Sequence, residues 1–228
     1  MERNGEVILA NNAAIDQIYQ YVREQILIGN LKENDKIGER TIGEQFGVSK
    51  TVVREAFYEL KKNGWIYAVE KSGTYVAPVD IQAVIENYEC RIRLEPVVLT
   101  MAFPFMTKQD IAQMRQLLDQ MLYGSRSAYI QAETALHLLF NEKTNNRYVV
   151  DFFSGMHEGM MRAASQTSSG SGQRKLDSVR EWKHVIDLLD SGDIMMASHF
   201  LQMHIIGSYR SFCESLDDQS NLKKSIFL

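Results

Sequence analysis

Cysteine and long apolar runs are scarce in this chain of 228 residues. The two cysteines, Cys90 and Cys213, lie far apart and lack the paired spacings of zinc and redox motifs, so we expect two reduced thiols. No stretch approaches the roughly 18 apolar residues of a membrane-spanning helix, and the first residues, MERNGEVILANN, lack the features of a signal peptide. These absences argue against a disulfide and a membrane span, and they predict a cytoplasmic protein.

An excess of positive charge is also missing, because the formal net charge is -4. Proteins that bind nucleic acids usually show a basic domain or stripe, so the whole-chain charge argues weakly against that function. Positive charge does gather in one stretch, whose charged residues are Lys50, Arg54, Lys61 and Lys62 against Glu55 and Glu59. The placement of charge, and not its sum, must therefore decide.

Common enzyme motifs are missing as well. The segment His157-Glu158-Gly159-Met160-Met161 lacks the second histidine of a zinc protease motif. The chain contains neither a nucleophile elbow nor a glycine-rich phosphate loop. We therefore expect a protein that is not an enzyme. A metal-dependent enzyme stays an alternative, which turnover of a substrate by the C-terminal part would support.

The composition, 45% hydrophobic and 24% charged, is that of an ordinary globular protein. The chain contains several short helical patterns before residue 65. Apolar residues recur at helical spacing from Ile15 to Ile28 and again near Arg40 to Phe46, separated by a turn-rich stretch over 29–38. Ser49 can cap a third helix through its hydroxyl, and that helix is expected to end at Asn63-Gly64.

The pattern then changes to strands. The residues 65–69 and 74–76 read as two short strands around the turn Glu70-Lys71-Ser72-Gly73, which predicts a β-hairpin. Pro78 breaks the second strand, and the rest is helical in pattern, apart from a Gly/Ser-rich loop expected at 166–173. We predict a mainly α fold with two domains, 1–77 and 78–228. The expected helices of the second domain are 81–103, 107–123, 128–141, 148–164, 175–189 and 193–216.

The segment from Glu39 to Ala56 has the layout of a helix-turn-helix that reads DNA: a short helix, a glycine-containing turn and a second helix with a polar and basic start. Such a helix must be apolar behind, where it anchors, and polar in front, where its first turn meets phosphates and base edges. Two packed helices with a solvated charged face are the simpler alternative. The hairpin and the order of three helices favour DNA binding.

Three segments resemble the GntR family of bacterial regulators: Ile37-Gly38-Glu39-Arg40, the run from Gly47 to Ala56, and the hairpin strand Gly73-Thr74-Tyr75-Val76. The resemblance implies a winged helix-turn-helix that binds palindromic operator DNA as a homodimer, most often as a repressor. Lys50 stands where arginine is commoner in the family, so Arg54 is the better candidate for reading a base. The DNA-binding residues expected are Arg40, Ser49, Lys50, Thr51, Arg54, Lys71 and Gly73.

The C-terminal part resembles the FCD subgroup of that family over the segments 88–96, 131–137 and 145–148. The resemblance implies an all-α antiparallel helical bundle that binds a small-molecule effector, dimerises and often holds a divalent metal such as zinc, nickel or manganese. Arg91 has the position that faces the cavity in this subgroup, where a guanidinium would pair with an organic acid. Arg93 is expected on the surface.

The same resemblance implies that Glu133, His137 and His204 are metal ligands and, with Arg91, effector-binding residues. The family's third ligand position, however, is Trp182 here, and a tryptophan cannot ligate a metal.

Two interpretations of that site stay open. The site is degenerate and the pocket binds its effector without a metal, or His184 or His157 substitutes for the missing ligand. We favour the first, because a site weakens sharply when one ligand is lost.

Three functions are therefore weighed. A ligand-controlled DNA-binding regulator is favoured over a metal-dependent enzyme and over an effector-free protein that bridges DNA, for which a solid bundle core would be the telling observation.

Overall fold

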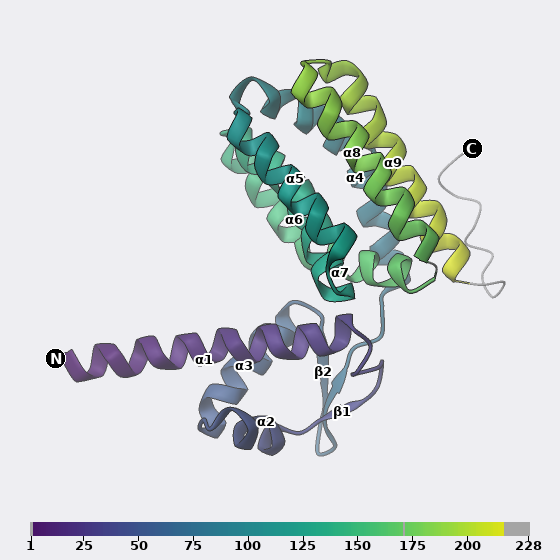
Figure 1. The fold of residues 1–228 in the computed structure, drawn as a ribbon. Helices are drawn as coiled ribbons and strands as arrows, with labels where there is room; N and C mark the ends of the chain where they lie inside the picture. The colour runs from purple at the N-terminus through teal and green to yellow at the C-terminus, as the bar shows by residue number, and fades with distance from the viewer. Residues whose placement is uncertain (1, 171, 217–228) are drawn as a thin grey trace. The chain divides into compact units, whose positions relative to one another are not determined.

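The computed structural model describes residues 2–170 and 172–216, with the side chains of 11–162, 164 and 172–216. The chain forms two compact units, Met1–Val79 and Asp80–Leu228, so the structural division falls two residues after the expected boundary. Each unit is considered by itself below (Figure 1). Among the described residues, no helix combines the length and apolar character needed to cross a bilayer.

The first unit contains the helices α1 (Glu2–Leu27), α2 (Glu39–Phe46) and α3 (Lys50–Lys62). Gly47 ends α2 in the left-handed conformation, with φ 65°, and Ser49 begins α3 by accepting a hydrogen bond from the Val52 amide. This glycine turn makes the α2–α3 pair a helix-turn-helix. The three helices bury a shared apolar core that includes Ile18, Val22, Ile42, Val53, Ala56 and Leu60.

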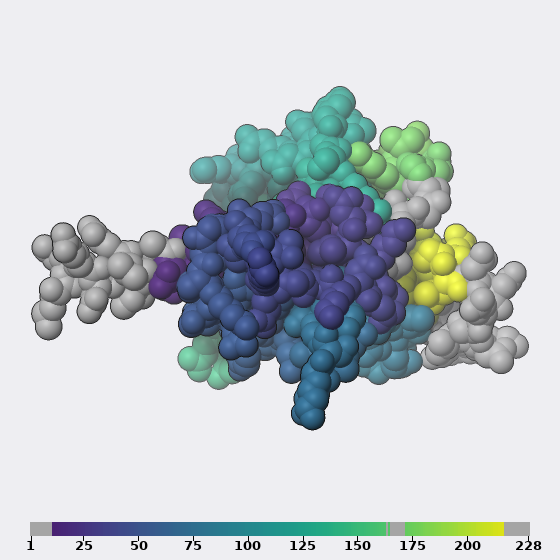
Figure 2. All heavy atoms as spheres, turned by 90° about the horizontal axis from the view of Figure 1, so that it is seen from below, coloured from purple at the N-terminus to yellow at the C-terminus, as the bar shows by residue number. Residues whose placement is uncertain are grey.

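A three-stranded antiparallel sheet completes the first unit, with β1 (Lys36–Ile37), β2 (Ile66–Val69) and β3 (Gly73–Val76) in the order β1-β3-β2. The β2–β3 hairpin confirms the expected wing, whose tip is the blue projection in Figure 2. Strand β1 was not expected, because two residues inside a turn-rich stretch are too short to show an alternating pattern.

The second unit is an all-α bundle, as expected, and helices that follow one another in the chain run antiparallel (Figure 1). Asp80, Thr107, Ser125 and Asp193 each accept a backbone hydrogen bond as the N-cap of a helix. Its elements are α4 (Ile81–Ala102), the 3-10 turn η1 (Phe103–Phe105), α5 (Lys108–Tyr123), α6 (Arg126–Lys143), α7 (Arg147–Gly170), α8 (Gly172–Ser191) and α9 (Ile194–Ser215).

The loop expected at 166–173 is wrong for the described residues. Helix α7 continues to Gly170 and α8 begins at Gly172, while residue 171 lies outside the described residues. Glycine costs a helix only about 1 kcal/mol relative to alanine, and serine costs less. Composition alone is therefore a weak argument against helix where long helices flank the segment on both sides.

Pro96 lies inside α4, and two side chains of α9 form hydrogen bonds with the backbone around it. Proline has no N–H, so the carbonyl of Ile92, four residues earlier, loses its helical partner. The side-chain amide of Gln202 donates to that carbonyl at 3.1 Å, and the Ser198 hydroxyl donates to the Pro96 carbonyl at 3.0 Å. These bonds fix α4 against α9, and both helices supply side chains to the site described next.

Candidate functional site

The first unit gathers basic side chains around one carboxylate at the helix-turn-helix. Lys50 Nζ and Arg54 Nε lie 3.7 Å and 3.2 Å from Glu39 Oε2, and Arg40 Nε donates to Glu44 at 2.7 Å. The three cationic side chains are 66%, 62% and 91% exposed, in the same order. They can therefore exchange these partners for DNA phosphates at little cost.

Arg54 uses only Nε in the hydrogen bonds of the described residues, so both terminal nitrogens stay available for a base edge. Glu39, the first residue of α2, lies between two of the expected DNA-contacting residues, Lys50 and Arg54. No local pattern in the sequence indicated these two ion pairs, because they join α2 to α3.

The remaining expected DNA contacts have clear local roles. Lys71 lies in the turn of the hairpin, with φ 60°, and is exposed there. Thr51 is exposed on the first turn of α3, whereas the Ser49 hydroxyl is engaged as the cap. Gly73 has φ 135°, and a Cβ there would lie 2.8 Å from Cε of Lys36, so the backbone alone explains this glycine.

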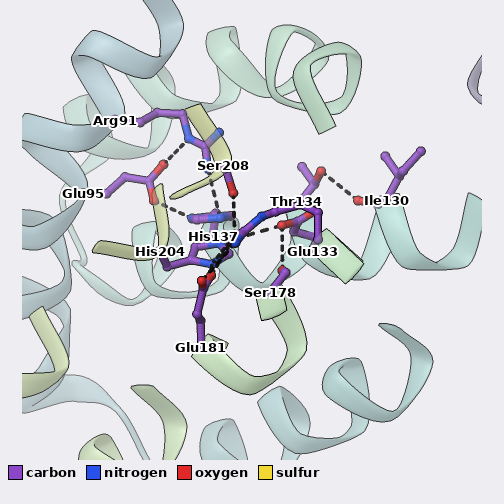
Figure 3. Close-up of polar contacts among 11 residues, drawn as sticks. Arg91, Glu95, Ile130, Glu133, Thr134, His137, Ser178, Glu181, His204 and Ser208 are labelled. Atoms are coloured by element: carbon purple, nitrogen blue, oxygen red, sulfur yellow. Dashed lines mark hydrogen bonds and ion pairs between the residues drawn. The ribbon is translucent and has the colours of Figure 1, made fainter. Parts of the chain in front are cut away.

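The second unit holds a buried polar cluster that we call the sensor site (Figure 3). Four helices build it: α4, α6, α8 and α9. Its side chains project inward because they recur at helical spacing of three, four or seven residues on each helix. The members are Arg91 and Glu95 on α4, Glu133 and His137 on α6, Arg174, Ser178, Glu181 and Trp182 on α8, and His204 and Ser208 on α9.

Arg91, Glu95 and His137 form a closed triangle in which each side chain contacts the other two. Arg91 Nε donates to Glu95 Oε1 at 2.7 Å, and Arg91 Nη2 lies 2.9 Å from His137 Nε2. His137 Nδ1 hydrogen-bonds the other Glu95 oxygen. This geometry assigns the proton of His137 to Nδ1, so that Nε2 accepts from the guanidinium.

Burial and these partners set the charges of the triangle. Burial lowers the pKa of His137 to about 4, against the attraction of Glu95, so the imidazole is neutral at pH 7. Burial alone would raise the pKa of Glu95, but the charges and hydrogen bonds of His137 and Arg91 outweigh it and hold the pKa at about 2. The contact with Glu95 likewise raises the pKa of Arg91 against its burial. The site thus holds an ionised Arg91–Glu95 pair.

A second group surrounds His204. His204 Nδ1 lies 2.8 Å from Glu181 Oε2, and Arg174 donates to both oxygens of Glu181 at 2.9 and 2.7 Å. Arg174 also donates to the Ser208 hydroxyl at 3.1 Å. These hydrogen bonds outweigh burial and lower the pKa of Glu181 to about 2. A second guanidinium, Arg174, therefore belongs to the sensor site.

Among the buried polar atoms of this site, Glu133 Oε2, His204 Nε2 and Trp182 Nε1 have no hydrogen-bond partner within the described residues. The other Glu133 oxygen accepts from Ser178 at 3.0 Å and lies 3.7 Å from His204 Nε2. The Trp182 ring packs 4.8 Å from His137 and 5.1 Å from His204, measured between centroids. Native proteins rarely leave such atoms unsatisfied, so each of them needs a partner, such as an ordered water or a ligand, that the described side chains do not supply.

A small enclosed cavity of about 10 Å³ borders Arg91, Glu133 and His137. That volume holds about one water-sized group. Tyr88, Thr134, Met160, Ala164 and Ser208 complete its lining. The core of the bundle therefore has room for about one water molecule at this place.

The donor set does not fit a resident divalent metal. Arg91 occupies Nε2 of His137, the nitrogen that a metal would need, and the Trp182 ring stands against both histidines. Within 11–162, 164 and 172–216, no group of three or more His, Cys, Asp or Glu side chains is arranged to hold a metal ion. The expected ligands Glu133, His137 and His204 do come together, but each histidine contacts a guanidinium, His137 that of Arg91 and His204 that of Arg174.

The substitute ligands weighed from the sequence are not part of the site. His184 is exposed, with its ring 4.2 Å from that of Phe200, and His157 does not line the cavity. Arg91 is buried and Arg93 is exposed, as expected. Glu95 and Arg174 were missed, although the spacing of Arg91 and Glu95 by four residues was a usable signal.

Comparison with known proteins agrees with the two units. The profile of the "Bacterial regulatory proteins, gntR family" matches residues 14–76, and the profile of the FCD domain matches residues 86–207. The chain belongs to the GntR family and carries an FCD domain. Both the family and its named members are transcription regulators, in agreement with the expectation of a regulator and not an enzyme.

Curated relatives include the HTH-type regulator YdhC of Bacillus subtilis, 24% identical over 62% of this chain, and the Uxu operon regulator of Haemophilus influenzae, 30% identical over 66%. Each match spans 61% of the relative's own length. An arabinose metabolism repressor of Geobacillus stearothermophilus is 40% identical, but over 27% of this chain and 17% of its own.

Solved structures show the same fold. Escherichia coli McbR superposes with a TM-score of 0.73 at 18% identity, covering 90% of this chain and 99% of McbR. The metal-free FCD domain of the regulator TM0439 gives 0.54 at 20% identity, covering 61% of this chain and 98% of that domain. These comparisons do not name an effector.

Proposed function

We propose that this protein is a ligand-responsive transcription repressor whose FCD domain binds a small organic acid without a resident metal. Arg91 carries the proposal. It is a buried cation that lines the cavity, and its Nη1 takes part in no hydrogen bond among the described residues. A carboxylate entering the cavity would accept from that nitrogen in a site of low dielectric, where a charge-assisted hydrogen bond is strong.

Effector binding must change the packing of the bundle. The cavity holds about one water-sized group, and a whole acid needs several times that space. Side chains that line the cavity must therefore move, and they belong to helices α4, α6, α7 and α9. This coupling between ligand and helix packing is the physical basis on which an effector would alter DNA affinity.

The winged helix-turn-helix supplies the DNA contacts. We assign phosphate contacts to Arg40, Lys50 and Lys71, which are exposed cations, and base reading to Arg54, whose planar fork is free. Thr51 lies beside them on the first turn of α3. Glu39 stabilises this group of cations in the absence of DNA.

We place the dimer contact on the exposed face of α4. Leu94, Val97 and Met101 follow one another at steps of three and four residues there, and they are 42%, 56% and 39% exposed. A second copy of the chain would bury this stripe by two-fold symmetry. Val97→Asp should yield monomers in sedimentation experiments, whereas Met195→Asp on α9, which is 74% exposed, should leave the dimer intact.

The test of the effector site combines elemental mass spectrometry with thermal shifts in a panel of carboxylic acids, with and without chelator. We expect no stoichiometric metal and an acid-specific rise in Tm that survives the chelator and is lost in Arg91→Met. A metal at one equivalent per chain, or stabilisation that the chelator abolishes, would contradict a metal-free site. Acids that leave both Tm and operator affinity unchanged would contradict the sensor function.

A further inference from the structure

A carboxylate alone cannot satisfy the hydrogen-bonding groups of the sensor site, because the unpartnered atoms include an acceptor as well as donors. Trp182 Nε1 can only donate, as can the guanidinium of Arg91. Glu133 Oε2 can only accept while the carboxyl is ionised. A plain carboxylate would pair with Arg91 and leave Glu133 Oε2, the unpartnered acceptor of a residue that lines the cavity, without a donor.

Glu133 is the decisive side chain. It is only 8% exposed and borders the cavity, and its other oxygen already accepts from Ser178. Arg91 and Arg174 are each engaged with another carboxylate, Glu95 and Glu181 respectively. The oxygen that accepts from Ser178 also lies 3.7 Å from His204 Nε2, whereas Oε2 has no hydrogen-bond partner among the described residues. Glu133 therefore brings an unpartnered oxygen to the lining of the cavity.

We propose that the effector acid carries a hydrogen-bond donor on the carbon next to its carboxylate, a hydroxyl or an ammonium group, which Glu133 accepts in the cavity. This inference rests on the proposed function, because it takes for granted that an acid binds at Arg91. The cavity of about 10 Å³ beside Glu133 matches the size of one such group. Opposite polarity at Arg91 and Glu133 would then fix the orientation of the ligand.

Two series of matched acids test the proposal with the full-length protein. Succinate, malate and aspartate share one skeleton and carry hydrogen, hydroxyl or ammonium at the same carbon, and so do propionate, lactate and alanine. In calorimetry, we expect the best donor-bearing acid of each series to bind roughly tenfold more tightly than the plain acid. The plain acid leaves a buried acceptor unpaired, and the free energy that this usually costs corresponds to about such a ratio of affinities.

Variants of Glu133 locate the effect and distinguish the two donors. Glu133→Met should abolish the preference for the donor-bearing acid. Glu133→Gln keeps an accepting oxygen without the charge, so it should weaken an ammonium compound more than a hydroxy acid. Glu142→Met is the matched control, because it removes an exposed carboxylate from the same helix, α6, and should keep the preference.

The outcomes separate this inference from the proposed function. Equal affinity for succinate, malate and aspartate, with binding still dependent on Arg91, would overturn the inference and leave acid sensing intact. A preference that persists in Glu133→Met would also overturn it, and the wild-type series decides if that variant does not fold. Failure of every acid to bind would overturn both.

Discussion

The two units carry their charges in opposite ways. In the helix-turn-helix, Arg40, Lys50 and Arg54 pair with carboxylates while their side chains stay more than 60% exposed. In the sensor site, Arg91 and Glu95 pair with side chains 6% and 0% exposed. Exposed pairs contribute little and exchange partners readily, whereas a buried pair is costly to break. The first arrangement suits the exchange of partners with DNA, and the second holds a ligand site in one geometry.

Removing Glu95 should produce the largest effect. Glu95→Ala leaves the Arg91 charge buried without its partner and frees His137 Nδ1, so we expect a loss of about 3–5 kcal/mol in the free energy of unfolding. Urea denaturation at pH 7 measures it. Glu44→Ala breaks the exposed pair with Arg40 and should cost less than about 1 kcal/mol. Similar losses for the two variants would refute the contrast between the units.

Acidification should also act on the buried unit. His137 has a folded-state pKa of about 4 against an ordinary 6.5, so the unfolded chain takes up a proton first as the pH falls. Its contribution is complete above pH 6.5 and is lost as the pH falls to 4, by about 3 kcal/mol. Glu95 and Glu181, with folded-state pKa values of about 2 against 4.5, extend the loss below pH 4.5.

Unfolding by urea at a series of pH values checks this prediction. His137→Gln should flatten the decline between pH 6.5 and 4, and the exposed His199→Gln should retain it. A wild-type stability that stays constant over that range would show that His137 is not held neutral by burial.

The residues proposed to contact DNA should show smaller effects, measured as losses of DNA-binding free energy. Arg54→Ala should cost about 1–3 kcal/mol on the specific operator and relax selection at one base position, because Arg54 has a free fork. Lys71→Ala should weaken binding to all sequences similarly and lower the salt dependence. Fluorescence anisotropy with operator and random DNA separates these effects. Equal losses on both DNAs for Arg54→Ala would contradict base reading.

Glu39 should give the smallest effect. Glu39→Gln removes a negative charge that lies between Lys50 and Arg54, so binding to random DNA should strengthen about two- to fivefold at low salt, the range of an exposed ion pair. The gain should shrink as salt is added, because screening shortens the reach of the charge. Unchanged or weaker binding at low salt would show that Glu39 does not oppose phosphate.

Local sequence signals predicted the helix-turn-helix of the first unit, but not the start of its first helix, which begins at Glu2 and not at the expected Ile15. A glycine that can adopt a left-handed conformation at Gly47, a capping serine at Ser49 and apolar residues at helical spacing act over a few residues, so they are visible without a structure. The hairpin wing is equally local. The two-residue strand β1 escaped notice because its only partner, β3, lies 37 or more residues further along the chain.

In the second unit, local patterns predicted the helices but not the contacts between them. The sequence by itself determined a helical bundle and brought Arg91, Glu133, His137 and His204 forward as candidates, through helical periodicity and family resemblance. Only the tertiary structure decided what they contact. His137 meets Glu95 and Arg91 across 42 and 46 residues of chain, and Trp182 packs against two histidines from other helices. Such pairings depend on how helices cross, and no local pattern records the crossing.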